Sequence, residues 1–156
     1  MFETEIMEFE AIDLVGYKHQ GDYMNIGGVF EKLFIYGGSH GLLNANTRSI
    51  GLYYGDPQST PIDELQSMAC VTASSDDIPA DSDAPEAMQI PAGKYATLLF
   101  KGSYAELEKP YSWLVGQWLP QSGHEAADFP PFEEYLNDPK ETPPSELLTR
   151  IHCKLV

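Results

Sequence analysis

The stretch "GLYYGDP" at residues 51–57 recurs as "EEYLNDP" at residues 133–139, with a tyrosine and a closing Asp-Pro in the same places. Tyr53 corresponds to Tyr135, which sets the offset between the two copies at 82. Downstream, "DELQSMACV" (63–71) matches "SELLTRIHC" (145–153) at the same offset of 82. Upstream, "KHQGDYMNIGGVFEKL" (18–33) matches "LFKGSYAELEKPYSWL" (99–114) at an offset of 81. This self-similarity predicts two copies of one structural unit.

Both copies show the same order of elements. A strand at 11–19 or 94–101 leads through a Gly-x-Tyr turn to an amphipathic helix, and a strand closed by Asp-Pro and a last strand follow. We therefore expect an α+β fold of tandem βαββ repeats, with antiparallel sheets and one main helix per repeat. The predicted organisation is a single domain, 1–156, made of repeat 1 (about 5–73), an acidic linker (about 74–90) and repeat 2 (about 91–156).

Each predicted helix carries an apolar stripe that we expect to pack on its sheet. The stripe residues are Ile26, Phe30, Leu33 and Phe34 in the first helix, and Leu107, Tyr111, Leu114, Val115 and Trp118 in the second. Between the copies, "SSDDIPADSDAPEAMQIP" is rich in Asp, Ser and Pro, which predicts a solvated connection rather than a separate element. It lacks the glycine and glutamate of an EF-hand calcium loop.

Composition limits the functions open to the chain. Its 156 residues, 42% of them hydrophobic, suffice for one core, and 24 acidic against 9 basic residues give a formal charge of -15. Such a charge disfavours direct binding to nucleic acid or to an anionic membrane and favours a cationic small molecule or a basic protein surface. The acidic N-terminus is unlike a secretory signal, and no apolar run approaches the ~18 residues of a membrane span, so we expect a cytoplasmic protein. The two cysteines form no CxxC pair, so we expect reduced thiols.

The stretch "FEEYLNDP" at residues 132–139 places one carboxylate on each face of a predicted strand. Because strand side chains alternate, Phe132, Glu134 and Leu136 share one face and Glu133 and Tyr135 share the other. In the first copy the Glu134 face corresponds to Ile50, Leu52 and Tyr54, and the Glu133 face to Gly51, Tyr53 and Gly55. The Glu133 face therefore combines a carboxylate and a ring with space for a flat ligand, and Glu134 is a secondary candidate on the more apolar face.

If the terminal strand pairs with this one, we expect His152 on the face of Glu133, because Ile151, Cys153 and Leu155 form the apolar alternate. Arg150 and Lys154 share the face of His152. A solvated cross-strand ion pair of Glu133 is therefore the alternative to a ligand site.

Aromatic residues supply the candidate walls of such a site. Trp113 lies off the second helix stripe and replaces Lys32 of the first copy, which favours a groove wall over a surface ring. Trp118 lies on the stripe, where core packing is its expected role, and Tyr95 is expected in the core or lining a cavity. Tyr53 and Tyr135 are expected to be either ligand contacts or an equivalent pair of packing residues.

The order "GDY", "IGLYYGDP", "IPAGKYATLLFKGSY", "WLPQSGHE", "FEEYLNDP" and a terminal strand resembles the GyrI-like effector-binding domains, including the ligand-binding halves of multidrug-responsive AraC-type and MerR-type regulators. The resemblance runs from about Glu8 to Val156, and "IPAGKYA" and "FEEYLNDP" are its most specific parts. It implies the SHS2-type fold of two βαββ repeats related by a pseudo-twofold axis. No helix-turn-helix precedes the domain, so we expect a stand-alone member without the DNA-reading role of fused bacterial relatives.

The resemblance also implies a function, the capture of amphipathic and often cationic drug-like molecules in a cleft between the repeats. The family's functional carboxylate follows the phenylalanine, which here makes it Glu133. One departure is the terminal "IHCKL", which places His152 where the family has a tyrosine. This difference predicts an altered choice of ligand.

Catalytic signatures are weak, so we expect no catalytic residues, cofactor or metal. The four histidines show no metal-ligand spacing, Ser122 near His124 has no nucleophile elbow, and no glycine-rich phosphate loop follows a strand. Two alternatives come from the resemblance: a hydrolase of strained cyclopropane electrophiles that uses a glutamate of the cavity, and a protein partner, either DNA gyrase or a regulator.

Overall fold

The computed structural model describes residues 2–78, 81 and 83–156. By internal packing the chain divides into two units. We call Ala11–Pro91 the first unit, and Ala92–Val156 together with the N-terminal strand the second unit. All strand pairs within the units are antiparallel, and each unit has one main helical segment.

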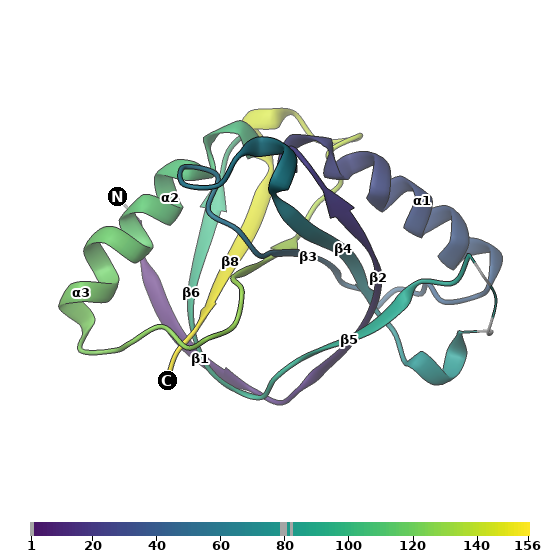
Figure 1. Cartoon of the computed structure of the whole chain (residues 1–156), viewed down its shortest axis with the longest axis horizontal. Coiled ribbons are helices and arrows are strands. Elements are labelled where there is room, and N and C mark those ends of the chain that lie inside the picture. Colours follow the sequence, from purple (N-terminus) through teal and green to yellow (C-terminus); the bar gives the residue numbers. More distant parts are fainter. Residues whose placement is uncertain (1, 79–80, 82) are drawn as a thin grey trace. The chain divides into compact units, whose positions relative to one another are not determined.

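The first unit is a four-stranded sheet in the order β5-β2-β4-β3, with helix α1 on one face (Figure 1). Its elements are β2 (Ile12–Gln20), a 3₁₀ turn (Tyr23–Asn25), α1 (Ile26–Ser39), β3 (Ser49–Tyr53), a 3₁₀ turn (Ile62–Glu64), β4 (Gln66–Thr72), a 3₁₀ turn (Ser75–Asp77) and β5 (Glu86–Ile90). Leu33 and Tyr36 of α1 pack on Val15 and Val71 of the sheet.

The second unit repeats this plan, with the strand order β1-β6-β8-β7 and a helical segment on one face (Figure 1). Its elements are β1 (Thr4–Phe9), β6 (Gly93–Lys101), a 3₁₀ turn (Tyr104–Glu106), α2 (Glu108–Trp113), a π-helical turn (Leu114–Trp118), α3 (Leu119–Ser122), β7 (Phe132–Tyr135), a 3₁₀ turn (Pro144–Glu146) and β8 (Leu148–Lys154). Leu114 packs against Leu98 and Ile151 in the core.

Strand registers confirm the repeat that the sequence predicts. In the first unit Cys70 of β4 lies opposite Ile50 of β3, and in the second unit His152 of β8 lies opposite Phe132 of β7. At the offset of 82, His152 is the sequence equivalent of Cys70, and Phe132 is the equivalent of Ile50. The two units therefore share strand order and residue pairing, and a Phe132 side chain stands where the first unit has Ile50.

The predicted acidic linker is wrong in its last part. Glu86–Ile90 forms β5 and pairs with β2, just as β1 pairs with β6. Strands β1 and β5 are themselves equivalent, since Met7 and Met88 are related by the offset of 81 and occupy matching places. Each copy thus begins with a strand that pairs with the long strand of the other copy. This long-range pairing leaves no local signal beyond a short apolar alternation.

The predicted burial of the helix stripes is confirmed except at Phe34 and Val115, which are equivalent positions of the two units. Ile26, Phe30 and Leu33 are buried, as is Leu114, whereas Phe34 and Val115 are exposed. At 100° per residue, Phe34 lies at the edge of the stripe, where the sheet no longer covers it.

This difference in burial gives a direct test of the core. Leu114 is 1% exposed and Val115 is 53% exposed. Leu114→Ala should lower the free energy of unfolding by about 2–5 kcal/mol because it leaves a cavity, while the neighbouring Val115→Ala should change it by about 0.5 kcal/mol or less. Urea denaturation measures both, and equal losses for the two variants would contradict the packing described above.

Candidate functional site

Glu133 of β7 is a charged residue in the hydrophobic core of the second unit. It pairs with Ile151 of β8, and Ile151 belongs to the core cluster beneath the helical segment. The side chain of Glu133 therefore points toward the helices, and the residue is only 5% exposed. A buried carboxylate costs free energy unless hydrogen bonds or an opposite charge compensate it, so the surroundings of Glu133 decide what it can do.

Two tyrosine hydroxyls donate hydrogen bonds to the Glu133 carboxylate. Tyr111 of α2 donates to Oε2 at 2.7 Å, and Tyr135 of β7 donates to Oε1 at 2.9 Å. Tyr135 reaches it because residues two apart on a strand share a face. Both carboxylate oxygens are thus held by neutral donors, with an aromatic ring attached to each donor.

Burial raises the pKa of Glu133 from its ordinary value of 4.5 to about 7, although the hydrogen bonds from Tyr111 and Tyr135 lower it. Desolvation therefore outweighs the two hydrogen bonds. None of the ion pairs among the described residues includes Glu133. The carboxylate is poised between its protonated and ionised forms near neutral pH, and a cation placed beside it would favour the ionised form.

A third tyrosine borders this group. The ring of Tyr104 packs edge-on against Tyr135 with centroids 5.5 Å apart. Burial raises the pKa of Tyr104 to about 12, and the nearby charges of Glu133 and Asp138 contribute to the same shift. We call Tyr104, Tyr111 and Tyr135 around Glu133 the tyrosine cluster, and all three residues are half-buried.

The first unit has no equivalent of this carboxylate. Gly51 stands at the position of Glu133, and Phe30 stands at the position of Tyr111. The carboxylate and the hydroxyl that binds it are thus both present in one copy and both absent from the other. The helix stripe predicts core packing for Tyr111, and no pattern in the sequence singles out Tyr104, so neither was predicted as a site residue. The paired change of Gly51 to Glu133 and Phe30 to Tyr111 is the signal that would have found Tyr111.

The expectation that His152 shares the face of Glu133 is wrong. His152 pairs with Phe132, so it lies on the opposite face of the sheet, where its ring stacks on Phe132 with centroids 4.4 Å apart. Its Nδ1 lies 3.1 Å from the Thr97 hydroxyl. Alternation alone shows two faces but not which residues of neighbouring strands share one, because a shift of one residue in register exchanges the faces.

Glu134 and Tyr95 also lie on the His152 face. Glu134 pairs with Arg150 and is buried. Tyr95 is fully buried, its ring stacks on Phe9 at 4.3 Å, and burial raises the pKa of its hydroxyl to about 12. Their ligand-binding roles, like that of His152, stay predictions, and these residues are not part of the tyrosine cluster.

The two tryptophans pack on the helix side of the second unit. Trp113 is half-buried and lies 5.8 Å from the ring of Phe2, which the pairing of β1 with β6 brings near it. Trp118 stacks on His124 with centroids 6.2 Å apart. Both also pack against the core cluster. The predicted contact of either ring with a ligand stays a prediction.

Tyr53, in the first unit, packs edge-on against Tyr23 with centroids 4.8 Å apart. This pair corresponds to Tyr135 and Tyr104 of the second unit. A ligand role for Tyr53 stays a prediction.

A cavity of about 530 Å³ opens in the first unit, on the face opposite α1, and its lining includes Lys18, Tyr54, Met68 and Met88. Lys18 and Glu86 of this lining form an exposed ion pair, with the ammonium 3.7 Å from the carboxylate, so the two charges compensate each other. We place the candidate site at Glu133 instead, because a desolvated carboxylate with a strongly shifted pKa is a better indicator of function than volume alone.

Within the described residues, no cluster of His, Cys, Asp and Glu side chains has the geometry of a metal site. In the same part of the chain, no helix is long and apolar enough to cross a bilayer.

Comparison with known proteins gives a consistent family and fold. The family model of the GyrI-like small molecule binding domain matches residues 2–155. A protein named DNA gyrase inhibitor from Erwinia billingiae is 30% identical over 137 residues, which are 86% of each chain. The EcmrR C-terminal domain superposes with a TM-score of 0.77 at 18% identity, covering 100% of this chain and 98% of that one. SAV2435 bound to tetraphenylphosphonium superposes with a TM-score of 0.67 at 18% identity, covering 99% and 94%.

The raised pKa of Glu133 predicts a pH-dependent stability. Between pH 4.5 and about 7 the folded protein keeps a proton that the unfolded chain releases, so the contribution of Glu133 to stability falls as pH rises through this window. Glu133→Gln removes this titrating group. Its effect on the free energy of unfolding should therefore be more stabilising at pH 8 than at pH 5, by roughly 2–3 kcal/mol.

Urea denaturation at the two pH values measures this difference. Glu141→Gln, at an exposed glutamate, is the matched control and should have the same small effect at both. An effect of Glu133→Gln that does not depend on pH would show that the carboxylate is not desolvated.

Proposed function

The chain belongs to the family of GyrI-like small molecule binding domains, and we propose that it binds amphipathic aromatic cations at Glu133 and the tyrosine cluster. The observation that carries the proposal is the buried carboxylate of Glu133, which is held by two neutral hydroxyls and is in no ion pair with a described residue. A desolvated carboxylate that forms no ion pair with any described residue is suited to a cation from outside the protein.

Two physical effects favour such a ligand. Charge–charge attraction grows as the effective dielectric constant falls, so a cation gains more beside Glu133 than beside a carboxylate in water. The three tyrosine rings add cation–π attraction of roughly 0.5–2 kcal/mol for a cation placed over a ring face. The formal charge of -15 attracts cations over a longer range but does not select among them.

Tetraphenylphosphonium, which SAV2435 binds, is a suitable first probe. Its charge is permanent and shielded by four phenyl rings, so it tests the carboxylate and the aromatic surface without supplying a hydrogen bond. Its charge does not depend on pH, and any pH dependence of its binding must come from the protein.

A second candidate function is inhibition of DNA gyrase by protein binding. It is favoured by the Erwinia billingiae relative that bears this name and by the strongly acidic composition, which suits a basic partner surface. Supercoiling by purified gyrase, titrated with this protein, tests it. Inhibition that is unchanged in Glu133→Gln would separate this activity from ligand capture.

A hydrolase is a third candidate and rests on the same carboxylate. A glutamate with a pKa of about 7 can act as a general base near neutral pH. Turnover of a strained cyclopropane electrophile that Glu133→Gln abolishes would establish this reaction, and binding without turnover would rule it out for that substrate.

Calorimetric titration with tetraphenylphosphonium tests the proposed function. Glu133→Gln should weaken binding at pH 8 by roughly 1.5–3 kcal/mol, the scale of an interaction with a charged group. Lowering the pH to 5.5 should weaken binding to the wild-type protein more than about tenfold, because the free site is then mostly protonated.

Glu134→Gln is the matched control, since it removes the neighbouring carboxylate from the other face and should have a much smaller effect. Raised salt screens the long-range attraction of the acidic surface but not a desolvated contact. A cation affinity that disappears with salt and survives Glu133→Gln would reject the proposal.

A further inference from the structure

We propose that the Tyr104 hydroxyl is a ligand-binding hydrogen-bond donor, so that the site prefers aromatic cations that also carry a hydrogen-bond acceptor such as a carbonyl. This inference rests on the proposed function of Glu133. Glu133 would bind the cationic centre of the ligand, and Tyr104 would bind a hydrogen-bond acceptor elsewhere on it. It comes from a difference between the two units in how the ends of their last two strands are joined.

In the first unit a tyrosine hydroxyl joins these strand ends. Tyr23 is the equivalent of Tyr104 at the offset of 81. Its hydroxyl lies 2.7 Å from the carbonyl oxygen of Gly55 and 3.2 Å from that of Gln66, and it accepts a hydrogen bond from the Gly55 amide at 2.9 Å. The hydroxyl thus connects the end of β3 to the start of β4, and it is fully used within the protein.

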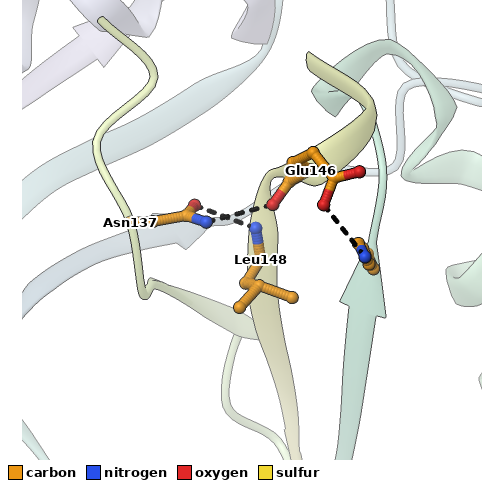
Figure 2. Close-up of polar contacts among 4 residues, drawn as sticks. Asn137, Glu146 and Leu148 are labelled. Carbon is orange, nitrogen blue, oxygen red and sulfur yellow. Dashed lines mark hydrogen bonds and ion pairs between the residues drawn. The ribbon is translucent and has the colours of Figure 1, made fainter. Parts of the chain in front are cut away.

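In the second unit an asparagine side chain takes over this connection (Figure 2). Asn137 occupies the position of Gly55 at the offset of 82. Its Nδ2 donates to the carbonyl oxygen of Glu146 at 3.0 Å, and its Oδ1 accepts from the amide of Leu148, the equivalent of Gln66, at 2.9 Å. The strand ends are therefore joined without Tyr104.

Tyr104 keeps the ring contact of Tyr23 but not its hydrogen bonds. Its ring packs on Tyr135 as Tyr23 packs on Tyr53. Its hydroxyl makes no hydrogen bond with any described residue, and it is not among the buried polar atoms, so it reaches the surface. The second unit thus retains a tyrosine whose hydroxyl is available to a ligand.

The location of this hydroxyl determines what it would recognise. Tyr135, against which Tyr104 packs, donates to Glu133 Oε1. The pKa of Tyr104 is raised to about 12, so the group remains a neutral phenol at physiological pH. A phenol is a stronger donor than acceptor. A ligand whose cationic centre lies at Glu133 would therefore gain a hydrogen bond if it placed a carbonyl or ether oxygen at Tyr104.

Matched phosphonium probes test this inference. Tetraphenylphosphonium has no acceptor, and the 2-, 3- and 4-acetyl derivatives of one of its phenyl rings add a carbonyl in three positions. At least one acetyl isomer should bind the wild-type protein about two- to tenfold more tightly than the parent cation, the range of one neutral hydrogen bond. Tyr104→Phe keeps the aromatic ring and removes only the hydroxyl, so it should abolish the difference in affinity between the acetyl isomer and the parent cation.

Tyr23→Phe is the matched control from the first unit. It should lower the thermal midpoint because it leaves Gly55 and Gln66 without this hydroxyl, while the acetyl gain persists. Tyr104→Phe should leave the midpoint unchanged. The inference is overturned if no acetyl isomer binds more tightly than the parent, if the gain survives Tyr104→Phe, or if Tyr104→Phe destabilises the protein as Tyr23→Phe does. A parent cation that does not bind at all would instead refute the proposed function on which the inference rests.

Discussion

Hydrogen bonds from Tyr111 and Tyr135 to the buried carboxylate of Glu133 are the interaction on which the site depends. They hold the carboxylate in the core without neutralising it, because each donor is an uncharged hydroxyl. An arginine or lysine in their place would stabilise the ionised form more strongly but would occupy the position of an external cation. The protein instead keeps a desolvated group whose pKa stands at about 7. In the proposed function, the opposite charge of a ligand would recover the cost of burying it.

Duplication of the βαββ unit explains how such a site is built without loss of the fold. Each copy has the same strand order and register, so one scaffold is present twice. At equivalent positions the first copy has Gly51 and Phe30 and the second has Glu133 and Tyr111. The copies also differ in the residue that joins the ends of their last two strands by hydrogen bonds, which is Tyr23 in the first copy and Asn137 in the second. The differences between the copies therefore separate residues that join the strand ends from the residues that we propose for binding.

The sequence predicted the repeat, the main helix of each copy, the three strands of each βαββ copy and the separation of Glu133 from Glu134, because each follows from local periodicity or from the repeat offset of 81 to 82. It did not predict the strands Thr4–Phe9 and Glu86–Ile90, whose partners lie far along the chain. The face of His152 was wrong because alternation does not fix the register between strands. Tyr111 was missed because a tyrosine on an apolar helix stripe resembles a core residue, and only the structure shows its hydroxyl reaching a carboxylate.

Proton release on ligand binding shows whether a cation replaces a proton at Glu133. Titration of tetraphenylphosphonium into the protein at pH 6, in two buffers of different ionisation enthalpy, measures the protons released. With a pKa of about 7 the free site is mostly protonated at this pH, so we expect the release of close to one proton per cation bound, and none in Glu133→Gln. Binding to the wild-type protein without proton release, or equal release in the variant, would contradict it.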